Sequence, residues 1–168
     1  MKAFFTGHRD VKWMEPDCRK SINQLIDRAI ADGVTYFYSG MALGVDMIAA
    51  EELLKRNLPW TAVIPCADQP NRWIKKEQAR YRDLLKKANA VVTLYPEYAD
   101  GVMQARNQWM IDNSQICLTI YDGISQTGGT ALTIQMAIAA NLKIYRAYRK
   151  QPVTVLYQGY EQLKLFEF

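Results

Sequence analysis

Hydrophobic positions along the chain follow two alternating periods. Six short apolar runs, rich in β-branched and aromatic residues, predict buried strands at residues 3–6, 35–39, 60–65, 90–95, 116–121 and 142–145. Between them, apolar residues at helical spacing predict helices at about 14–30, 43–56, 72–88, 102–113 and 129–140. Met14 begins the apolar face of the first helix, Gly33 lies where its C-cap belongs, and Pro59 ends the second. Residues 152–158 predict a further strand, and the alternation at 163–168 suggests an edge strand.

Strands that alternate with helices over the whole chain predict an α/β fold with a mostly parallel sheet. No repeat, low-complexity linker or shift in composition divides the chain, so we expect one domain over residues 1–168. In open parallel sheets, ligands bind at the carboxyl ends of the strands. The residues that follow each strand are therefore the first place to look for a site.

Composition narrows the classes of function. Apolar residues make up 49% of the chain and charged residues 23%, and the net charge of +4 permits contact with phosphates without indicating nucleic acid by itself. Three widely spaced cysteines without a CxxC pair suggest reduced thiols and a cytoplasmic protein. With a single histidine we expect no metal site, and the sequence indicates no cofactor. We also expect no signal peptide and no membrane partner, because no apolar run has the necessary length.

The first predicted strand ends in Thr6, Gly7, His8 and Arg9. Gly7 allows a tight turn close to a ligand, Thr6 offers a hydroxyl, and the Arg9 guanidinium suits a phosphate or carboxylate. His8 is either a catalytic base or a histidine packed in a turn. The chain has no Ser or Cys nucleophile motif that would complete a triad with it.

The second strand ends in a loop with two glycines, Gly40 and Gly44, between Ser39 and Asp46. Glycines at a strand–helix junction can expose backbone amides to a phosphate, although this loop is neither a GxGxxG fingerprint nor a Walker loop. Asp46 lies in the first turn of the next helix, where it either complements the helix dipole or contacts a ligand.

The fifth strand is followed by Asp122 and then by Gly128, Gly129 and Thr130 at the start of a helix. Bare amides and a hydroxyl at a helix N-terminus favour a phosphate. The alternative is a loop that needs positive φ, with a threonine as N-cap. Because three strand ends share this chemistry, we predict a ligand that contains phosphate.

Two cationic features remain ambiguous. Arg106 lies in an apolar stripe of the fourth predicted helix, where it either clamps an anion or forms a surface salt bridge with Asp112 or another acid. Seven cations lie between Arg72 and Lys87, near Trp73 and Tyr81. They form either a solvated helix face or a surface for single-stranded nucleic acid.

Taken together, the motifs resemble the SLOG superfamily, and most closely its YpsA-type branch of bacterial proteins. The resemblance rests on TGHR (6–9), SGMALGVDMIAAE (39–51), Pro65, Gln69 and Trp73, GVMQARNQWMID (101–112), and YDG with GGT (121–123 and 128–130). It spans residues 4 to about 140. It implies a Rossmann-like three-layer αβα sandwich that binds a nucleotide or nucleotide-derived ligand, as a sensor or as a nucleotide-processing protein.

Two related families define the alternatives. The Lonely Guy phosphoribohydrolases hydrolyse nucleoside monophosphates, and their Met-x-x-Arg and glycine-threonine elements resemble residues 103–106 and 128–130 here. Their catalytic glutamate follows that threonine by two residues, where this chain has Leu132. Asp46, Glu51 or Asp122 would have to supply the carboxylate that an N-glycosidic bond requires. The DNA-processing protein DprA has a pattern similar to residues 39–49 and binds single-stranded DNA.

The sequence and the resemblance together define a set of site residues. The expected ligand-binding residues are Thr6, Gly7, His8, Arg9, Ser39, Gly40, Gly44, Asp46, Arg106, Asp122, Gly128, Gly129 and Thr130. The candidate catalytic residues are Arg106, Asp46, Glu51 and Asp122. The expected partner is a nucleotide-like small molecule, with nucleic acid as a less favoured partner. A homo-oligomer through the stripe around Trp109 is an open alternative to a core role for that residue.

Overall fold

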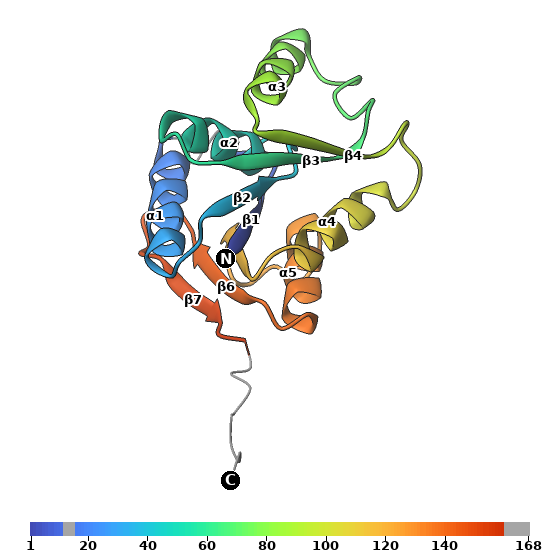
Figure 1. The fold of residues 1–168 in the computed structure, drawn as a ribbon. Coiled ribbons are helices and arrows are strands. Elements are labelled where there is room, and N and C mark those ends of the chain that lie inside the picture. Colours follow the sequence, from blue (N-terminus) through green and yellow to red (C-terminus); the bar gives the residue numbers. More distant parts are fainter. Residues whose placement is uncertain (12–15, 160–168) are drawn as a thin grey trace.

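The computed structural model describes residues 1–11 and 16–159, which form a sheet flanked by helices (Figure 1). The strands are β1 (Lys2–Gly7), β2 (Tyr36–Ser39), β3 (Trp60–Cys66), β4 (Ala90–Tyr95), β5 (Ile116–Ile120), β6 (Lys143–Ala147) and β7 (Thr154–Tyr157). The helices are α1 (Asp17–Ala31), α2 (Val45–Lys55), α3 (Lys75–Lys87), α4 (Val102–Asp112) and α5 (Gly129–Ala139).

The seven strands form one sheet in the order β4-β3-β2-β1-β5-β6-β7. All neighbours are parallel except β6 and β7, which are antiparallel. Helices α1, α2 and α3 cover one face and α4 and α5 the other, as Figure 1 shows. The predicted α/β class and three-layer αβα arrangement with a mostly parallel sheet are confirmed.

The predicted elements all occur where the described residues allow comparison, with ends that differ by up to three residues. The largest difference is at α3, which begins at Lys75 because residues 67–73 form turns. In these turns the Asn71 amide donates to the Asp68 carbonyl at 3.0 Å and the Trp73 amide to the Pro70 carbonyl at 2.9 Å. Met14 and the suggested strand at 163–168 lie outside the described residues.

The core lies on both faces of the sheet because successive strand residues point in opposite directions. Phe5 and Phe37 stack beneath α1 and α2, with ring centroids 6.1 Å apart. Their neighbours Phe4 and Tyr38 belong to the cluster under α4 and α5. Trp109 packs against this second cluster, with its ring edge-on to Tyr38 at 5.2 Å, so it contributes to the core.

Strand β4 differs from its prediction as a buried strand. Among the described strands it lies at the edge of the sheet and pairs only with β3, and it leaves Val91 and Tyr95 each 44% exposed. Among the helices, α4 makes the main contact with β4. The β4 side chains that do not face α4 therefore reach solvent. An apolar β-branched run alone does not distinguish an edge strand from a central one.

The structure bears on the state of the cysteines and on the length of the apolar helices. Cys18, Cys66 and Cys117 are free thiols, and all three are buried. Within residues 1–11 and 16–159, every helix is too short or too polar to cross a bilayer.

Candidate functional site

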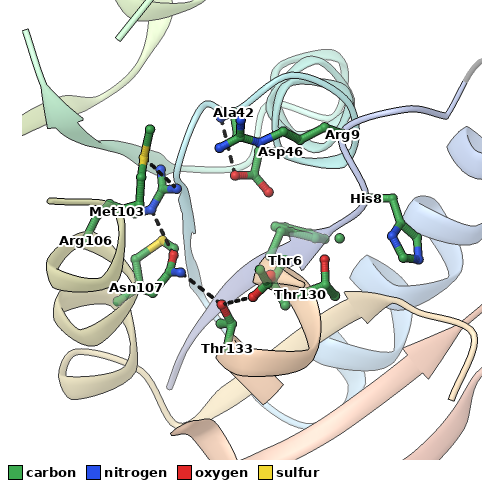
Figure 2. Close-up of a pocket in the computed structure, with 14 residues that line it drawn as sticks. Thr6, His8, Arg9, Ala42, Asp46, Met103, Arg106, Asn107, Thr130 and Thr133 are labelled. Atoms are coloured by element: carbon green, nitrogen blue, oxygen red, sulfur yellow. Dashed lines mark hydrogen bonds between the residues drawn. The ribbon is translucent and has the colours of Figure 1, made fainter. Parts of the chain in front are cut away.

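A cavity of about 240 Å³ opens at the carboxyl end of β1, next to β5 (Figure 2). The chain leaves β1 toward α1 on one face of the sheet and leaves β5 toward α5 on the other, so the strand order reverses here. Such a reversal leaves a crevice above the strand ends. The expected site residues that line the cavity are Thr6, Gly7, His8, Arg9, Asp46, Arg106, Gly129 and Thr130.

The other expected residues lie outside the lining of this cavity. They are Ser39, Gly40, Gly44, Glu51, Asp122 and Gly128. All of them except Glu51 help to hold a loop or helix whose other residues line the cavity.

Ser39 is fully buried and holds the loop between β2 and α2. Its hydroxyl donates to the carbonyl of Asp46 at 2.7 Å and accepts from the amide of Met41 at 3.2 Å. Met41 adopts a left-handed conformation with φ of 58°, which is uncommon for a bulky residue. Ser39 thus fixes the turn that presents Asp46.

Gly40 and Gly44 allow close packing, and the exposure of their backbone amides to a phosphate stays a prediction. Gly44 has φ of +86°, and a Cβ on it would clash with the backbone of His8 and Arg9. The Val45 amide at the start of α2 donates to the His8 carbonyl at 3.1 Å. A Cβ on Gly40 would clash with the Arg106 guanidinium. Each glycine therefore lets two parts of the site approach each other.

One carboxylate and two guanidiniums dominate the electrostatics of the cavity. Burial raises the pKa of the Asp46 carboxyl to about 6, although Arg106, the Ala42 amide and Arg9 oppose this shift. Figure 2 shows the Arg9 side chain reaching across toward Asp46. Among the described residues that line the cavity, Asp46 is the only acid, so the two arginines leave a positive excess.

Arg106 is only 4% exposed, so the surface salt bridge with Asp112 is a wrong alternative. Its Nη1 donates to the Gly40 carbonyl and its Nε donates to Oδ1 of Asn107 at 2.9 Å. Burial lowers the pKa of the guanidinium, while Asp46 raises it. Asp112 instead accepts from Gln108 at 2.7 Å on the outer side of α4.

Asn107 is a site residue that the sequence reasoning did not select. Its Nδ2 donates to Oγ1 of Thr133 at 2.9 Å, and that hydroxyl donates to the Gly129 carbonyl at 2.8 Å (Figure 2). Arg106 is thereby connected to the first turn of α5. The available signal was the pair of polar residues, Arg106 and Asn107, in an otherwise apolar stripe.

The N-terminus of α5 faces the cavity without a side-chain cap. Gly128 is its N-cap residue with φ of +94°, so the alternative of a threonine N-cap is wrong while its requirement for positive φ is correct. Gly129 and Thr130 line the cavity, and a Cβ on Gly129 would meet nothing within 4 Å. Uncapped amides of a first helical turn suit an anion.

His8 and Asp122 lie at the other side of the site. Figure 2 shows the imidazole of His8 on the opposite side of the cavity from Arg106. Asp122 accepts from the Ser125 hydroxyl and from the amides of Ser125 and Ile124, both at 2.8 Å. These hydrogen bonds lower the pKa of Asp122 to about 2, with a smaller contribution from His8. Asp122 thus orders the loop that leads to α5.

Glu51 faces a different region, between α1, α2 and α3. It forms ion pairs with Arg80 and, at 3.2 Å, with Arg19. Its carboxylate is therefore engaged away from the cavity. Among the described residues, no group of three His, Cys, Asp or Glu side chains could hold a metal ion.

The sheet order and the helices on both faces define a Rossmann-like domain, with a cationic cavity at its switch point. A model of the YspA SLOG family (YpsA) matches residues 5–155, nearly the whole chain. The chain belongs to this family.

Curated relatives are distant bacterial proteins. The UPF0398 protein BH1768 of Halalkalibacterium halodurans is 25% identical over 71% of this chain and 65% of its own length. The UPF0398 protein of Brevibacillus brevis is 22% identical over 78% of this chain and 73% of its own length. The SPbeta prophage-derived protein YoqJ of Bacillus subtilis is 28% identical over 52% of this chain. The chain thus spans less than two thirds of the Halalkalibacterium protein.

Two solved structures share the fold. The DNA processing protein A (DprA) of Streptococcus pneumoniae superposes with a TM-score of 0.64 at 17% identity, over 86% of this chain and 49% of the DprA chain. The protein TM1055 superposes with a TM-score of 0.56 at 16% identity, over 85% of this chain and 71% of its own. These similarities concern the fold alone.

Proposed function

We propose that this protein binds a small phosphate-bearing ligand of the nucleotide type in the cavity above β1 and β5. The phosphate lies against the first-turn amides of α5, at Gly129 and Thr130. Arg9 and Arg106 contact its oxygens from the opposite wall. Thr6 and Asp46 provide hydrogen-bonding partners for the neighbouring ribose.

One observation carries this proposal: two arginines and an uncapped helix N-terminus line one cavity that has a single, partly neutralised acid. Guanidiniums pair with phosphate oxygens in a bidentate way, and helix amides add further donors. Membership of the YspA SLOG family agrees with a Rossmann-like ligand-binding domain. The small polar cavity suits a metabolite better than a polymer.

The test is a thermal-shift screen over nucleoside monophosphates, diphosphates and cyclic nucleotides, each beside its nucleoside. A ligand present at 100 times its Kd stabilises the fold by about 2.7 kcal/mol, which is readily measured. We expect phosphate-bearing compounds to raise the melting temperature and the matched nucleosides to have a smaller effect. Equal shifts with nucleotide and nucleoside, or none with either at millimolar concentration, would contradict the proposal.

A second candidate is a phosphoribohydrolase-type N-glycosidase, and the state of Asp46 favours it. A carboxyl that titrates near pH 6 inside a cavity is typical of a general acid. Leu132, at the position of the Lonely Guy glutamate, is exposed and apolar. Asp46 would therefore have to supply the carboxylate next to the N-glycosidic bond. Chromatography of a nucleoside monophosphate after incubation decides: free base that appears with the wild type and not with Asp46→Asn supports hydrolysis. If the nucleotide stays intact, the protein binds it without hydrolysing it.

Binding of single-stranded DNA is the third candidate, and it rests on the fold shared with DprA and on the cations of α3. Tyr81 is only 2% exposed and donates to Gln69 at 3.2 Å, so it is not available for base stacking. Affinity for an oligonucleotide that falls steeply with salt and with Lys75→Glu and Lys76→Glu would support this candidate. Retention of nucleotide binding in these variants would separate it from the cavity.

A further inference from the structure

A second cavity, of about 310 Å³, lies beside the first. The two share Arg9, Ala42 and Met103 as wall residues. Drug-sized ligands occupy pockets of roughly 300–1,000 Å³, so the first cavity alone is small for a whole nucleotide. The pair forms one elongated cleft with Arg9 at the junction.

The walls of the second cavity differ in chemistry from those of the first. Two aromatic side chains, Trp73 and Tyr98, line it together with Leu43. Trp73 is half-buried and fixed edge-on against Tyr81, with ring centroids 5.3 Å apart at 90°. Tyr98 is 60% exposed and lies on the loop after β4. Aromatic walls of this kind bind planar rings through stacking.

Polar residues hold these aromatic walls in place. The Cys66 thiol and the Tyr98 backbone lower the pKa of the Asp68 carboxyl. The Ala67 amide donates to the Tyr95 carbonyl at 3.0 Å, which ties the end of β4, just before the Tyr98 loop, to the end of β3. Gln69 accepts from the Tyr81 hydroxyl at 3.2 Å and donates to the Gly40 carbonyl at 3.4 Å.

The Gly40 carbonyl joins the two cavities. It accepts from Gln69 on the side of the second cavity and from Arg106 on the side of the first. Hydrogen bonds therefore hold together the wall between the cavities, and the position of this wall sets the boundary of both cavities. Among the described residues that line the second cavity, Arg9 and Arg72 face the single acid Asp68, which leaves a positive excess at this end of the cleft as well.

We propose that the second cavity is an aromatic-ring subsite, so that the ligand places its phosphate in the first cavity and a planar heteroaromatic ring between Trp73 and Tyr98. Arg9 then lies beside the link between the two parts. This inference rests on the proposed function, because the phosphate site sets the direction of the ligand.

The test compares ribose 5-phosphate, which has no ring, with AMP, which adds adenine to the same sugar phosphate. Isothermal titration should give AMP a lower Kd than ribose 5-phosphate, by between about fivefold and a hundredfold if one ring stacks. Tyr98→Ala should bring AMP close to ribose 5-phosphate and leave the latter unchanged. Tyr95→Ala is the matched control, since Tyr95 is exposed on β4 and lines neither cavity.

Tryptophan fluorescence supplies a second readout. AMP should quench part of the emission, ribose 5-phosphate should not, and Trp73→Phe should abolish that quenching while keeping most of the affinity. Equal Kd values for the two probes, or equal losses for both in Tyr98→Ala, would overturn the aromatic subsite while the phosphate site stands. If neither probe binds at millimolar concentration, the phosphate site fails, and the inference that depends on it fails with it.

Discussion

At the scale of single residues, the site depends on burying charge next to opposite charge. Asp46 and Arg106 are 7% and 4% exposed, which is rare for ionisable side chains. Hydrogen bonds to the Gly40 carbonyl and to Asn107 use two of the five N–H groups of the guanidinium, and the Ala42 amide donates to Asp46 at 3.3 Å. A buried charge that loses its partner is costly, so these residues constrain each other.

The raised pKa of Asp46 predicts a pH effect on stability. The folded state holds the Asp46 proton up to about pH 6, above its ordinary value of 3.8, so this group makes the free energy of unfolding fall as pH rises between these values. The full effect is on the order of 3 kcal/mol. Urea unfolding of the wild type and Asp46→Asn at several pH values measures it. From pH 4 to pH 7, the free energy of unfolding of the variant should rise relative to that of the wild type. A difference between the two proteins that does not change with pH would refute the raised pKa of Asp46.

Asn107 should act as a positioning residue for Arg106. Replacement by alanine removes the acceptor of Arg106 Nε and the donor to Thr133, which lowers stability by about 1–2 kcal/mol. Phosphate ligands should bind severalfold more weakly, by titration calorimetry. Gln108→Ala, on the outer side of the same helix, is the control and should leave affinity unchanged. Normal affinity in Asn107→Ala would show that Arg106 needs no support from it.

At the scale of elements, the start of α5 is the part of the site where the residue needed for stability and the residue next to the ligand are most clearly different. Gly128 has positive φ, whereas Gly129 is helical and has open space around it. The helix needs the first glycine for its backbone. The second leaves the approach to the amides open.

We predict that Gly129→Ala changes stability by less than about 1 kcal/mol, because alanine suits a helix, yet weakens phosphate binding by placing a methyl group at the amides. Gly128→Ala should instead cost about 1–3 kcal/mol, because φ of +94° with ψ of 170° is strained for any residue with a Cβ. Thermal unfolding and titration of both variants check this. A Gly129→Ala protein with full affinity would move the phosphate away from α5.

The elements also show what could be predicted from the sequence. Period and turn residues predicted the strands and helices of the described chain within three residues, because local patterning and tertiary packing agree there. The sequence could not distinguish the exposed edge strand β4 from the buried ones. It also did not indicate that Gly40 and Gly44 serve close packing. The link from Asn107 to Thr133 needed coordinates, since it joins residues 26 positions apart.

At the scale of the whole molecule, the sheet order gathers the strand ends into one cleft and spreads the remaining charge over the surface. Two of the six cations of α3 pair with acids: Arg80 with Glu51 and Glu77, and Lys87 with Asp83 at 2.9 Å. The positive excess in the cleft comes from other residues, the arginines that line it.

The central claim is that Arg9 and Arg106 bind the phosphate of a nucleotide-type ligand. Arg9 is exposed, so its removal should leave the fold intact, and Arg82, exposed on α3 and outside both cavities, gives a control with the same loss of charge. The most direct measurement is the Kd of AMP by titration calorimetry for the wild type, Arg9→Ala and Arg82→Ala. We predict at least a tenfold weaker Kd in Arg9→Ala, the loss of about 1.4 kcal/mol, and an unchanged Kd in Arg82→Ala. Equal affinities in all three proteins would contradict it.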